Sequence, residues 1–258
     1  MNVTSSLSLK EAAQLALQCL DLTSLNDADT AADIEALCLR AQGPHGAVAA
    51  VCVWPRFAAQ ARAALPAAIK VAAVANFPDG SLDLPRTLAE VAEIAAGGAD
   101  EIDVVLPYRA LMAGQGSEVA EFLAEVRHAS RPLTLKVIIE SGELRTPELI
   151  AEATCLALMA GADFIKTSTG KTPVSATPEA ARVMLAEIAA SGMSAAGFKA
   201  SGGIRSVADA QLYLQLAADA LGRDALNPRR FRFGASGLLA AIEAELGGAA
   251  APAAGQGY

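Results

Sequence analysis

The sequence predicts a single α/β domain, a (β/α)8 or TIM barrel, with an N-terminal helix and a flexible C-terminal tail. Its 258 residues match the length of a one-domain α/β barrel. Eight apolar runs alternate with helical stretches, and no linker or break in composition divides the chain before its end. We expect the barrel to comprise residues 1–246. Residues 247–258 are low in complexity and rich in Gly and Ala, and we expect them to form the tail.

The eight expected strands are apolar and rich in β-branched residues, and they begin roughly 20 to 35 residues apart, the length of one βα unit. They are residues 19–23, 47–53, 70–75, 101–106, 133–139, 163–167, 196–200 and 231–234. Eight such strands close into a barrel more naturally than they fill an open, doubly wound sheet.

Helix boundaries are marked between these runs. Thr146-Pro147-Glu148 and Thr177-Pro178-Glu179 each place a capping hydroxyl, a proline and an acid where a helix begins. Ser206 and Asp209 have the spacing of a capping box. Glycines end two helices immediately before the related segments GADEIDVV and GADFIKTS, and this internal repeat is typical of a barrel built from βα modules.

Composition excludes several classes of function. A net charge of −8 and a pI near 4.9 oppose a nucleic-acid surface. No apolar stretch is long enough to span a membrane, and the N-terminus lacks the features of a secretory signal, so we expect a cytoplasmic protein. Four scattered cysteines favour reduced thiols. Two isolated histidines cannot form a typical zinc site, so we expect no metal.

Charged residues inside predicted parallel strands are the informative exceptions, because such strands are buried on both faces. These positions are Asp103, Lys136, Glu140, Lys166 and Lys199. Lys166 and Lys199 lie near the C-terminal ends of the sixth and seventh strands, where barrel enzymes carry out their chemistry. One interpretation is structural: the lysines form buried ion pairs with Asp103, Glu101 and Glu140. The position of Lys166 and Lys199 on adjacent strands weakens this structural interpretation, because two neighbouring cations repel each other and destabilise the fold.

The second interpretation is Schiff-base chemistry. A free lysine has a pKa of about 10.4, and a second ammonium group about 4 Å away would lower that pKa by roughly three units. A neutral lysine attacks a carbonyl, and the resulting iminium accepts electrons when a carbon–carbon bond breaks. Because each lysine lowers the pKa of the other, either one can be the nucleophile. Asp103 fits the role of proton carrier, and it can also be a counter-ion of a lysine.

Two glycine-rich turns predict a phosphate site. Gly202 and Gly203 follow the seventh strand, and Gly234 and Ser236 follow the eighth and precede a helix. Backbone N–H groups and a helix N-terminus bind phosphate at this place in many barrels. Lys171, after the sixth strand, can add a charge-assisted contact or can be a solvated loop lysine.

Seven motifs from Asp21 to Gly237 together resemble the deoxyribose-phosphate aldolase family, the class I or Schiff-base aldolases. They are DLTSLN, NFP, GADEIDVVLPYRALMAG, LKVIIESGEL, AGADFIKTSTGK, GFKASGGIR and RFGASG. The resemblance implies reversible cleavage of 2-deoxy-D-ribose 5-phosphate to D-glyceraldehyde 3-phosphate and acetaldehyde, without a metal or organic cofactor. The expected partners are therefore a sugar phosphate and small aldehydes.

The resemblance also implies roles for residues. Lys166 is the expected Schiff-base lysine, Lys199 the lysine that lowers its pKa, and Asp103 the proton-relay acid. Further positions match the substrate pocket and the phosphate cradle; these are Asp21, Thr23, Thr167, Lys171, Gly202, Gly203, Gly234 and Ser236. Some family members end in a tyrosine that reaches the active site, and Tyr258 resembles it.

The chain departs from the family at two places. Ala200-Ser201 stands where relatives have Pro-Ala, and Ser236-Gly237 stands where relatives have paired serines. The second departure removes a hydroxyl from the expected phosphate cradle. Other possibilities are a Schiff-base aldolase for another sugar phosphate, a silent sugar-phosphate-binding protein and a metal-dependent aldolase. A homodimer formed through the outer helices is also possible, and Cys52 either faces the pocket or is an inert buried thiol.

Overall fold

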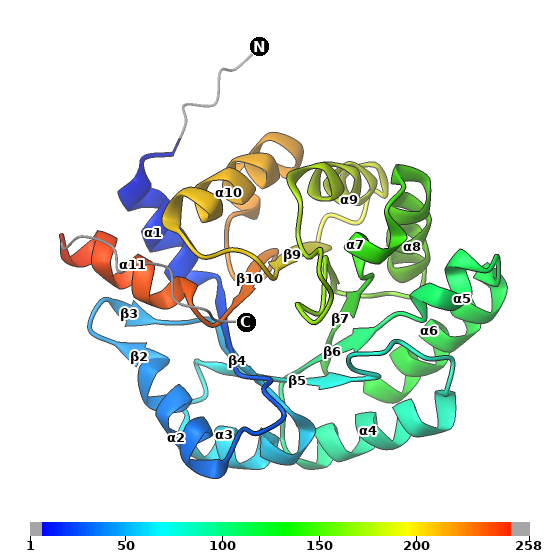
Figure 1. The fold of residues 1–258 in the computed structure, drawn as a ribbon, viewed down its shortest axis with the longest axis horizontal. Helices are drawn as coiled ribbons and strands as arrows, with labels where there is room; N and C mark the ends of the chain where they lie inside the picture. The colour runs from blue at the N-terminus through cyan, green and yellow to red at the C-terminus, as the bar shows by residue number, and fades with distance from the viewer. Residues whose placement is uncertain (1–6, 249–258) are drawn as a thin grey trace.

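A computed structural model describes residues 7–248 of the chain. Eight parallel strands form a closed barrel in the order β1-β10-β9-β8-β7-β6-β5-β4, and the helices surround it (Figure 1). The predicted (β/α)8 fold class is confirmed.

The barrel strands coincide with the predicted apolar runs to within a few residues. Their bounds are Leu20–Thr23 (β1), Ala50–Val53 (β4), Lys70–Ala75 (β5), Glu101–Val105 (β6), Thr134–Ile138 (β7), Phe164–Lys166 (β8), Gly197–Ser201 (β9) and Phe231–Ala235 (β10). The largest difference is at the start of β4, which was predicted at residue 47 and lies at Ala50. Ala47 belongs to a short antiparallel hairpin of Gln42–Gly43 (β2) and Gly46–Ala47 (β3), because it pairs with Gln42 before the barrel strand begins.

Each barrel strand is followed by at least one helical segment. The α-helices are Leu9–Gln18 (α1), Ala31–Arg40 (α2), Ala58–Ala64 (α3), Leu84–Ala96 (α4), Tyr108–Met112 (α5), Gly116–Ser130 (α6), Ser141–Leu144 (α7), Pro147–Met159 (α8), Pro178–Ala190 (α9), Val207–Leu221 (α10) and Leu238–Gly247 (α11). Two 3₁₀ turns span Pro55–Phe57 (η1) and Arg223–Ala225 (η2). The predicted N-terminal helix is α1, which packs against α10 and α11 (Figure 1).

The predicted helix starts are present. The hydroxyl of Thr146 accepts a hydrogen bond from the Leu149 N–H at the start of α8, and that of Thr177 accepts one from the Ala180 N–H at the start of α9. Ser206 and Asp209 form the capping box of α10. These caps satisfy amide groups that have no partner inside the helix, so they fix where each helix leaves its loop.

Strand register determines which side chains meet inside the barrel. Asp103 is paired with Lys136 across β6 and β7, and Lys166 is paired with Lys199 across β8 and β9. Lys199 is also paired with Arg232 on β10. Since side chains alternate between the two faces of a strand, these registers place charged groups side by side in an otherwise apolar interior.

The end of the predicted tail lies outside the described residues. Helix α11 includes Gly247, the first residue assigned to the tail, and Gly248 follows it with φ +70°. Tyr258 belongs to the part of the chain that is not described. Between residues 7 and 248, the structure has no helix with both the length and the apolar character needed to cross a bilayer.

Candidate active site

Seven charged residues form one buried cluster inside the barrel. Three carry carboxylates and four carry cations, and every member is at most 5% exposed. They are Asp21, Glu101, Asp103, Lys136, Lys166, Lys199 and Arg232. Buried charges need partners, and here each group lies against at least one opposite charge.

Asp103 joins the three lysines. Its Oδ2 atom accepts hydrogen bonds from Lys166 Nζ at 2.8 Å and from Lys199 Nζ at 2.7 Å. Its Oδ1 atom accepts one from Lys136 Nζ at 2.7 Å. The structure therefore brings together Asp103 and the three lysines that the sequence singled out, Lys136, Lys166 and Lys199.

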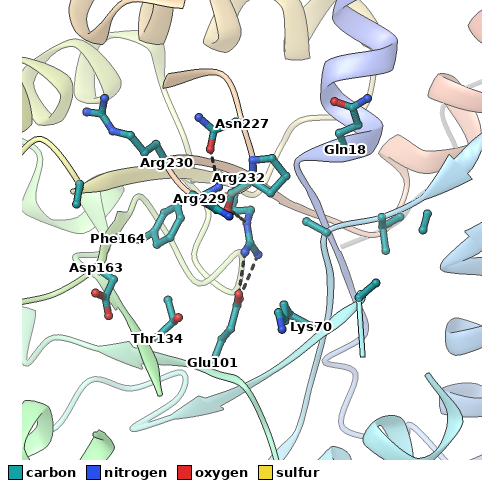
Figure 2. Close-up of a pocket in the computed structure, with 16 residues that line it drawn as sticks. Gln18, Lys70, Glu101, Thr134, Asp163, Phe164, Asn227, Arg229, Arg230 and Arg232 are labelled. Carbon is teal, nitrogen blue, oxygen red and sulfur yellow. Dashed lines mark hydrogen bonds and ion pairs between the residues drawn. The ribbon is translucent and has the colours of Figure 1, made fainter. Parts of the chain in front are cut away.

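The remaining acids and Arg232 complete the cluster toward the N-terminal end of the barrel. Arg232 Nη1 lies 2.6 Å from Asp21 Oδ1. Arg232 Nη2 lies 2.7 Å from Glu101 Oε1, and Figure 2 shows this contact. Asp21 Oδ2 is bonded to Lys199, and Glu101 Oε2 lies 2.6 Å from Lys136 Nζ. Each of these two acids thus links Arg232 to a lysine.

Asp103 reverses the pKa shift expected for the lysines. Burial is the largest single effect and would lower the pKa of Lys166, but the charge of Asp103 and its hydrogen bond, together with smaller contributions, outweigh burial, and the pKa of Lys166 is raised. Burial likewise opposes the charge of Lys199, while Asp103 and Asp21 raise its pKa. Repulsion between the lysines acts in the predicted direction but is the smaller effect. The predicted net lowering is wrong for this arrangement of charges, because the sequence argument did not place a carboxylate between the ammonium groups.

Asp103 itself remains ionised at neutral pH. Burial would raise its pKa, but Lys136, Lys166 and Lys199 hold that pKa well below its usual range. A carboxylate in this position can exchange a proton with either neighbouring lysine without moving far, since the hydrogen bonds are already formed.

Accessibility distinguishes the lysines. Lys136 and Lys199 are 0% exposed, whereas Lys166 is 3% exposed and is the last residue of β8. The C-terminal ends of the strands form the mouth where barrel enzymes bind substrate. Of the three lysines, Lys166 is the one with any exposed surface.

Polar contacts hold the loops around this mouth. The Thr167 hydroxyl accepts a hydrogen bond from Ser201 N at 3.0 Å, which ties the end of β8 to β9. The Thr23 hydroxyl donates to the Asp21 carbonyl oxygen at 2.8 Å. Lys171 Nζ donates to the Leu25 carbonyl oxygen at 2.7 Å and thereby connects the loop after β8 with the segment after β1. Thr23, Thr167 and Lys171 all lie on the C-terminal side of the barrel. That they line a substrate pocket stays a prediction.

Glu140 has a different role from the ion pair considered in the sequence. It has φ +54°, and its carboxylate accepts hydrogen bonds from the Thr169 hydroxyl at 2.5 Å and the Thr172 hydroxyl at 3.2 Å. These contacts fasten the loop that follows Lys166. Burial raises the pKa of Glu140, and the hydrogen bonds only partly oppose this shift.

The two glycine-rich turns lie on adjacent strands. Gly202 and Gly203 both have φ +81°, a region that favours glycine. A side chain on Gly234 would collide with the Ser201 side chain and approach Lys199 Cε to 3.1 Å, so glycine is required for the close packing of β9 and β10. Ser236 precedes α11, whose first turn has no side-chain cap, and it lines a cavity of about 210 Å³ together with Thr23.

One inner wall beside the lysines is apolar. Cys52 packs with Leu25, Ala72 and Val74 in a small cluster separate from the main core. Cys52 is fully buried, and burial raises the pKa of its thiol. Of the two alternatives for Cys52, its burial and raised pKa favour an inert buried thiol.

Arg232 is a member of the site that was not predicted from the sequence. Arg232 is a charged residue within the apolar strand FRFGA, so the rule that selected Lys166 and Lys199 also applies to it. Glu101 was considered only as an ion-pair partner. Its two partners, Lys136 and Arg232, lie on β7 and β10, and only the closed barrel brings these strands to the same acid.

The closed parallel barrel and the charged cluster at its centre define the class of protein: a (β/α)8-barrel enzyme. The model of the DeoC/LacD family aldolases matches residues 15–243. The chain belongs to this family and is an aldolase.

Individual relatives agree with the family. The chain is 49% identical over 252 residues to a deoxyribose-phosphate aldolase of Agrobacterium fabrum, covering 96% of this chain and 97% of that protein. A Toxoplasma gondii protein assigned as a deoxyribose-phosphate aldolase superimposes with a TM-score of 0.84 at 25% identity, covering 93% and 97% of the two chains. The tetrameric deoxyribose phosphate aldolase of Aeropyrum pernix gives a TM-score of 0.71 at 25% identity over 92% of each chain.

Proposed function

We propose that this aldolase reversibly cleaves 2-deoxy-D-ribose 5-phosphate to D-glyceraldehyde 3-phosphate and acetaldehyde, with Lys166 as the Schiff-base nucleophile. The observation that supports the proposal most directly is the shared contact of Lys166 and Lys199 with one oxygen of Asp103. The substrate is the one named for the Agrobacterium fabrum relative.

The first step requires an uncharged lysine. Proton transfer from Lys166 to Asp103 along their 2.8 Å hydrogen bond turns the ion pair into an amine and a carboxylic acid. Lys199 stays charged beside them, and its repulsion lowers the affinity of the Lys166 amine for a proton. The amine then attacks C1 of the open-chain sugar, and loss of water gives an iminium ion.

Bond cleavage requires a base at the C3 hydroxyl. Asp103, once it has passed its proton to the departing water, accepts the C3 hydroxyl proton, and the C2–C3 bond breaks. The electron pair of that bond moves into the iminium and forms an enamine, while C3 becomes the aldehyde of D-glyceraldehyde 3-phosphate. Protonation of the enamine carbon and hydrolysis by one water release acetaldehyde and regenerate Lys166.

The phosphate end of the substrate is assigned to the two glycine turns. Gly202, Gly203, Gly234 and Ser236 bring backbone N–H groups and the start of α11 together at the C-terminal side of the barrel. Lys171 is placed to add a positive charge from the loop after β8. The apolar wall around Cys52 suits the two-carbon acetaldehyde fragment.

Two further parts of the proposal concern the whole protein. We propose that Tyr258, which lies outside the described residues, delivers the proton to the enamine carbon. We also propose a cytoplasmic homodimer formed through the outer helices. Light scattering coupled to gel filtration distinguishes a dimer from a monomer or a tetramer.

Borohydride trapping tests the nucleophile and the substrate together. The protein is reduced in the presence of 2-deoxyribose 5-phosphate, digested and mapped by mass spectrometry. An adduct on Lys166 supports the proposal, and Lys166→Met abolishes that adduct. An adduct on Lys199 or Lys136 contradicts the assignment of roles. A folded protein that binds the sugar phosphate without any adduct contradicts the Schiff-base mechanism, and loss of activity in a chelator would instead favour a metal-dependent aldolase.

A further inference from the structure

Arg232 lies at the inner end of the charged cluster, on the side away from the substrate mouth. It is 5% exposed and lines a cavity of about 840 Å³ at the N-terminal ends of the barrel strands (Figure 2). The first residues of β5 and β6, Lys70 and Glu101, line the same cavity. This place is remote from the mouth at which the aldol chemistry is proposed.

The guanidinium of Arg232 is held in one orientation. Its Nε donates to the Pro228 carbonyl oxygen at 2.5 Å, and it lies 5.5 Å from the centre of the Phe164 ring. The two Nη atoms divide between Asp21 and Glu101. This planar group contacts Asp21 and both oxygens of Glu101 through two separate nitrogens at fixed positions, whereas a lysine has a single nitrogen for all such contacts.

Arg232 supplies the polar contacts of two carboxylate oxygens. Among the described residues, Asp21 Oδ1 and Glu101 Oε1 have Arg232 as their one hydrogen-bond or ion-pair partner. The other oxygen of Asp21 is bonded to Lys199, and the other oxygen of Glu101 is bonded to Lys136. If Arg232 is removed, each carboxylate is free to rotate its vacant oxygen toward the lysines, and both lysines then lose their fixed position against Asp103.

We propose that Arg232 is a positioning residue of the aldol reaction: it orients Asp21 and Glu101, which in turn hold Lys199 and Lys136 against Asp103. This inference rests on the proposed Schiff-base function. Arg232 touches neither the substrate nor Lys166; it acts through two acids and two lysines. A shift of about 1 Å in such groups is enough to cost about 100-fold in turnover.

The cavity provides a specific test, because it gives a small cation a route to the vacated position. Arg232→Ala leaves a space the size of a guanidinium group, adjoining a cavity whose lining includes the exposed residue Arg229. We expect turnover to fall by about 100-fold while KM for the sugar phosphate changes less than about threefold. Guanidinium chloride, below the concentration that unfolds the variant, is expected to restore turnover in a saturable manner, and sodium chloride at equal ionic strength is not.

Arg230→Ala is the matched control. Arg230 lines the same cavity and carries the same charge, but its side chain donates to the Ala196 carbonyl oxygen and does not contact the cluster. It should retain the turnover of the wild type and show no response to guanidinium. Equal effects of Arg230→Ala and Arg232→Ala would overturn the proposal, since they would point to the charge of the cavity and not to orientation of the acids.

Arg232→Lys keeps the test decisive if Arg232→Ala does not fold. A lysine retains the charge but has a single nitrogen, with three N–H groups. It cannot keep all four acceptors of Arg232, which are the Pro228 carbonyl oxygen, Asp21 Oδ1 and both oxygens of Glu101. A folded Arg232→Lys protein is therefore expected to lose turnover and to change the pH profile of kcat. Wild-type turnover and an unchanged pH profile in Arg232→Lys would overturn the inference. Borohydride trapping of Lys166 in the wild-type protein separates this inference from the proposed function. Absence of the adduct rejects the proposed function. A normal adduct together with wild-type turnover in the Arg232 variants rejects only the positioning role.

Discussion

Lys166 and Lys199 are paired in register on β8 and β9, and their ammonium groups donate to the same oxygen atom, Oδ2 of Asp103. Two like charges are thus held close together by a single acceptor. This arrangement makes the charge of each lysine depend on the protonation of Asp103, because loss of the carboxylate charge leaves burial and mutual repulsion opposed only by weaker partners, of which Asp21 is the one that pairs with Lys199. The three groups therefore titrate as one unit.

Asp103→Asn is expected to separate Schiff-base formation from bond cleavage. Without the carboxylate, burial and Lys136 lower the pKa of Lys166, so trapping of acetaldehyde by borohydride should extend to lower pH than in the wild type. Cleavage of the sugar phosphate should fall by about 10²- to 10⁴-fold, because the proton acceptor is gone. Asp100→Asn, which removes an acid paired with Arg62 at 2.7 Å, is the control. An unchanged pH dependence of trapping in Asp103→Asn would contradict the role of Asp103 as the dominant counter-ion.

The buried acids should also determine acid stability. Burial opposes ionisation of Asp21 and Asp103, but the surrounding cations lower the pKa of both in the folded state. Unfolded chains, with a carboxyl pKa near about 3.9, take up these protons first, so the folded state loses stability as pH falls below about 5. The raised pKa values of the lysines preserve their contribution up to about pH 10.

Urea unfolding at a series of pH values measures this effect. We expect the free energy of unfolding to be nearly constant between about pH 5 and pH 9 and to decrease by on the order of 3 kcal/mol toward pH 2. Asp21→Asn should have a smaller decrease than the wild type. A decrease of equal size in both proteins would place the titrating groups outside the cluster.

Much of the fold was predictable because the signals are local. Apolar β-branched runs, glycine stops and capping residues each act within a few residues of the chain, and the eight strands and the helix starts at Thr146, Thr177 and Ser206 followed from them. The short β2–β3 hairpin was missed, since two-residue strands leave no apolar period.

The candidate site was predictable only in part. Lys166, Lys199 and Asp103 are conspicuous because charges are unusual in buried strands. Their net pKa shifts were not predictable, because the sign depends on which lysine and which acid face each other across the closed barrel. Lys136 and Arg232 are separated by 96 residues in the chain (232 − 136), yet both contact Glu101. Only strand register brings them to the same acid.

The chain end provides a direct test of Tyr258. Deleting Tyr258 should lower turnover more than it changes substrate affinity, because the proposed role is proton transfer to the enamine and not binding. Tyr258→Phe, which removes only the hydroxyl, is expected to reproduce the deletion. Solvent deuterium exchange into acetaldehyde provides a second measurement, and it should slow in both variants. Unchanged kinetics and exchange would exclude the tyrosine from the reaction.

Gly234→Ala tests the close packing of β9 and β10. The added Cβ would collide with the Ser201 side chain and lie 3.1 Å from Lys199 Cε, so Lys199 must move. Turnover is expected to fall by about 100-fold. Gly237→Ala is a matched control a few residues away, because Gly237 has φ −86° and its Cβ would meet no atom within 4 Å. Similar losses in both variants would show that the turn, and not the contact with Lys199, is sensitive.

Ser201 is a departure from the family, and its position suggests a contact with the phosphate. Ser201 is 3% exposed, and among the described residues its hydroxyl has no hydrogen-bond partner. The hydroxyl lies against Gly234, and Ser201 directly precedes the Gly202-Gly203 turn. A buried hydroxyl without a partner is unfavourable in the unliganded protein. A phosphate oxygen bound at the two turns would satisfy it and would replace the hydroxyl that relatives carry at position 237.

Ser201→Ala should therefore weaken phosphate recognition without weakening the fold. A hydrogen bond to a charged group contributes about 1.5–3 kcal/mol, so KM for 2-deoxyribose 5-phosphate should rise by about tenfold or more. KM for unphosphorylated 2-deoxyribose should not change, and the unliganded variant should unfold at the same or a higher urea concentration. Ser141→Ala is the control, since Ser141 is also 3% exposed with no partner for its hydroxyl among the described residues, but it lies in α7, after β7, and belongs to neither glycine turn. Equal selectivity for the two sugars in Ser201→Ala and the wild type would show that the Ser201 hydroxyl does not contact the phosphate.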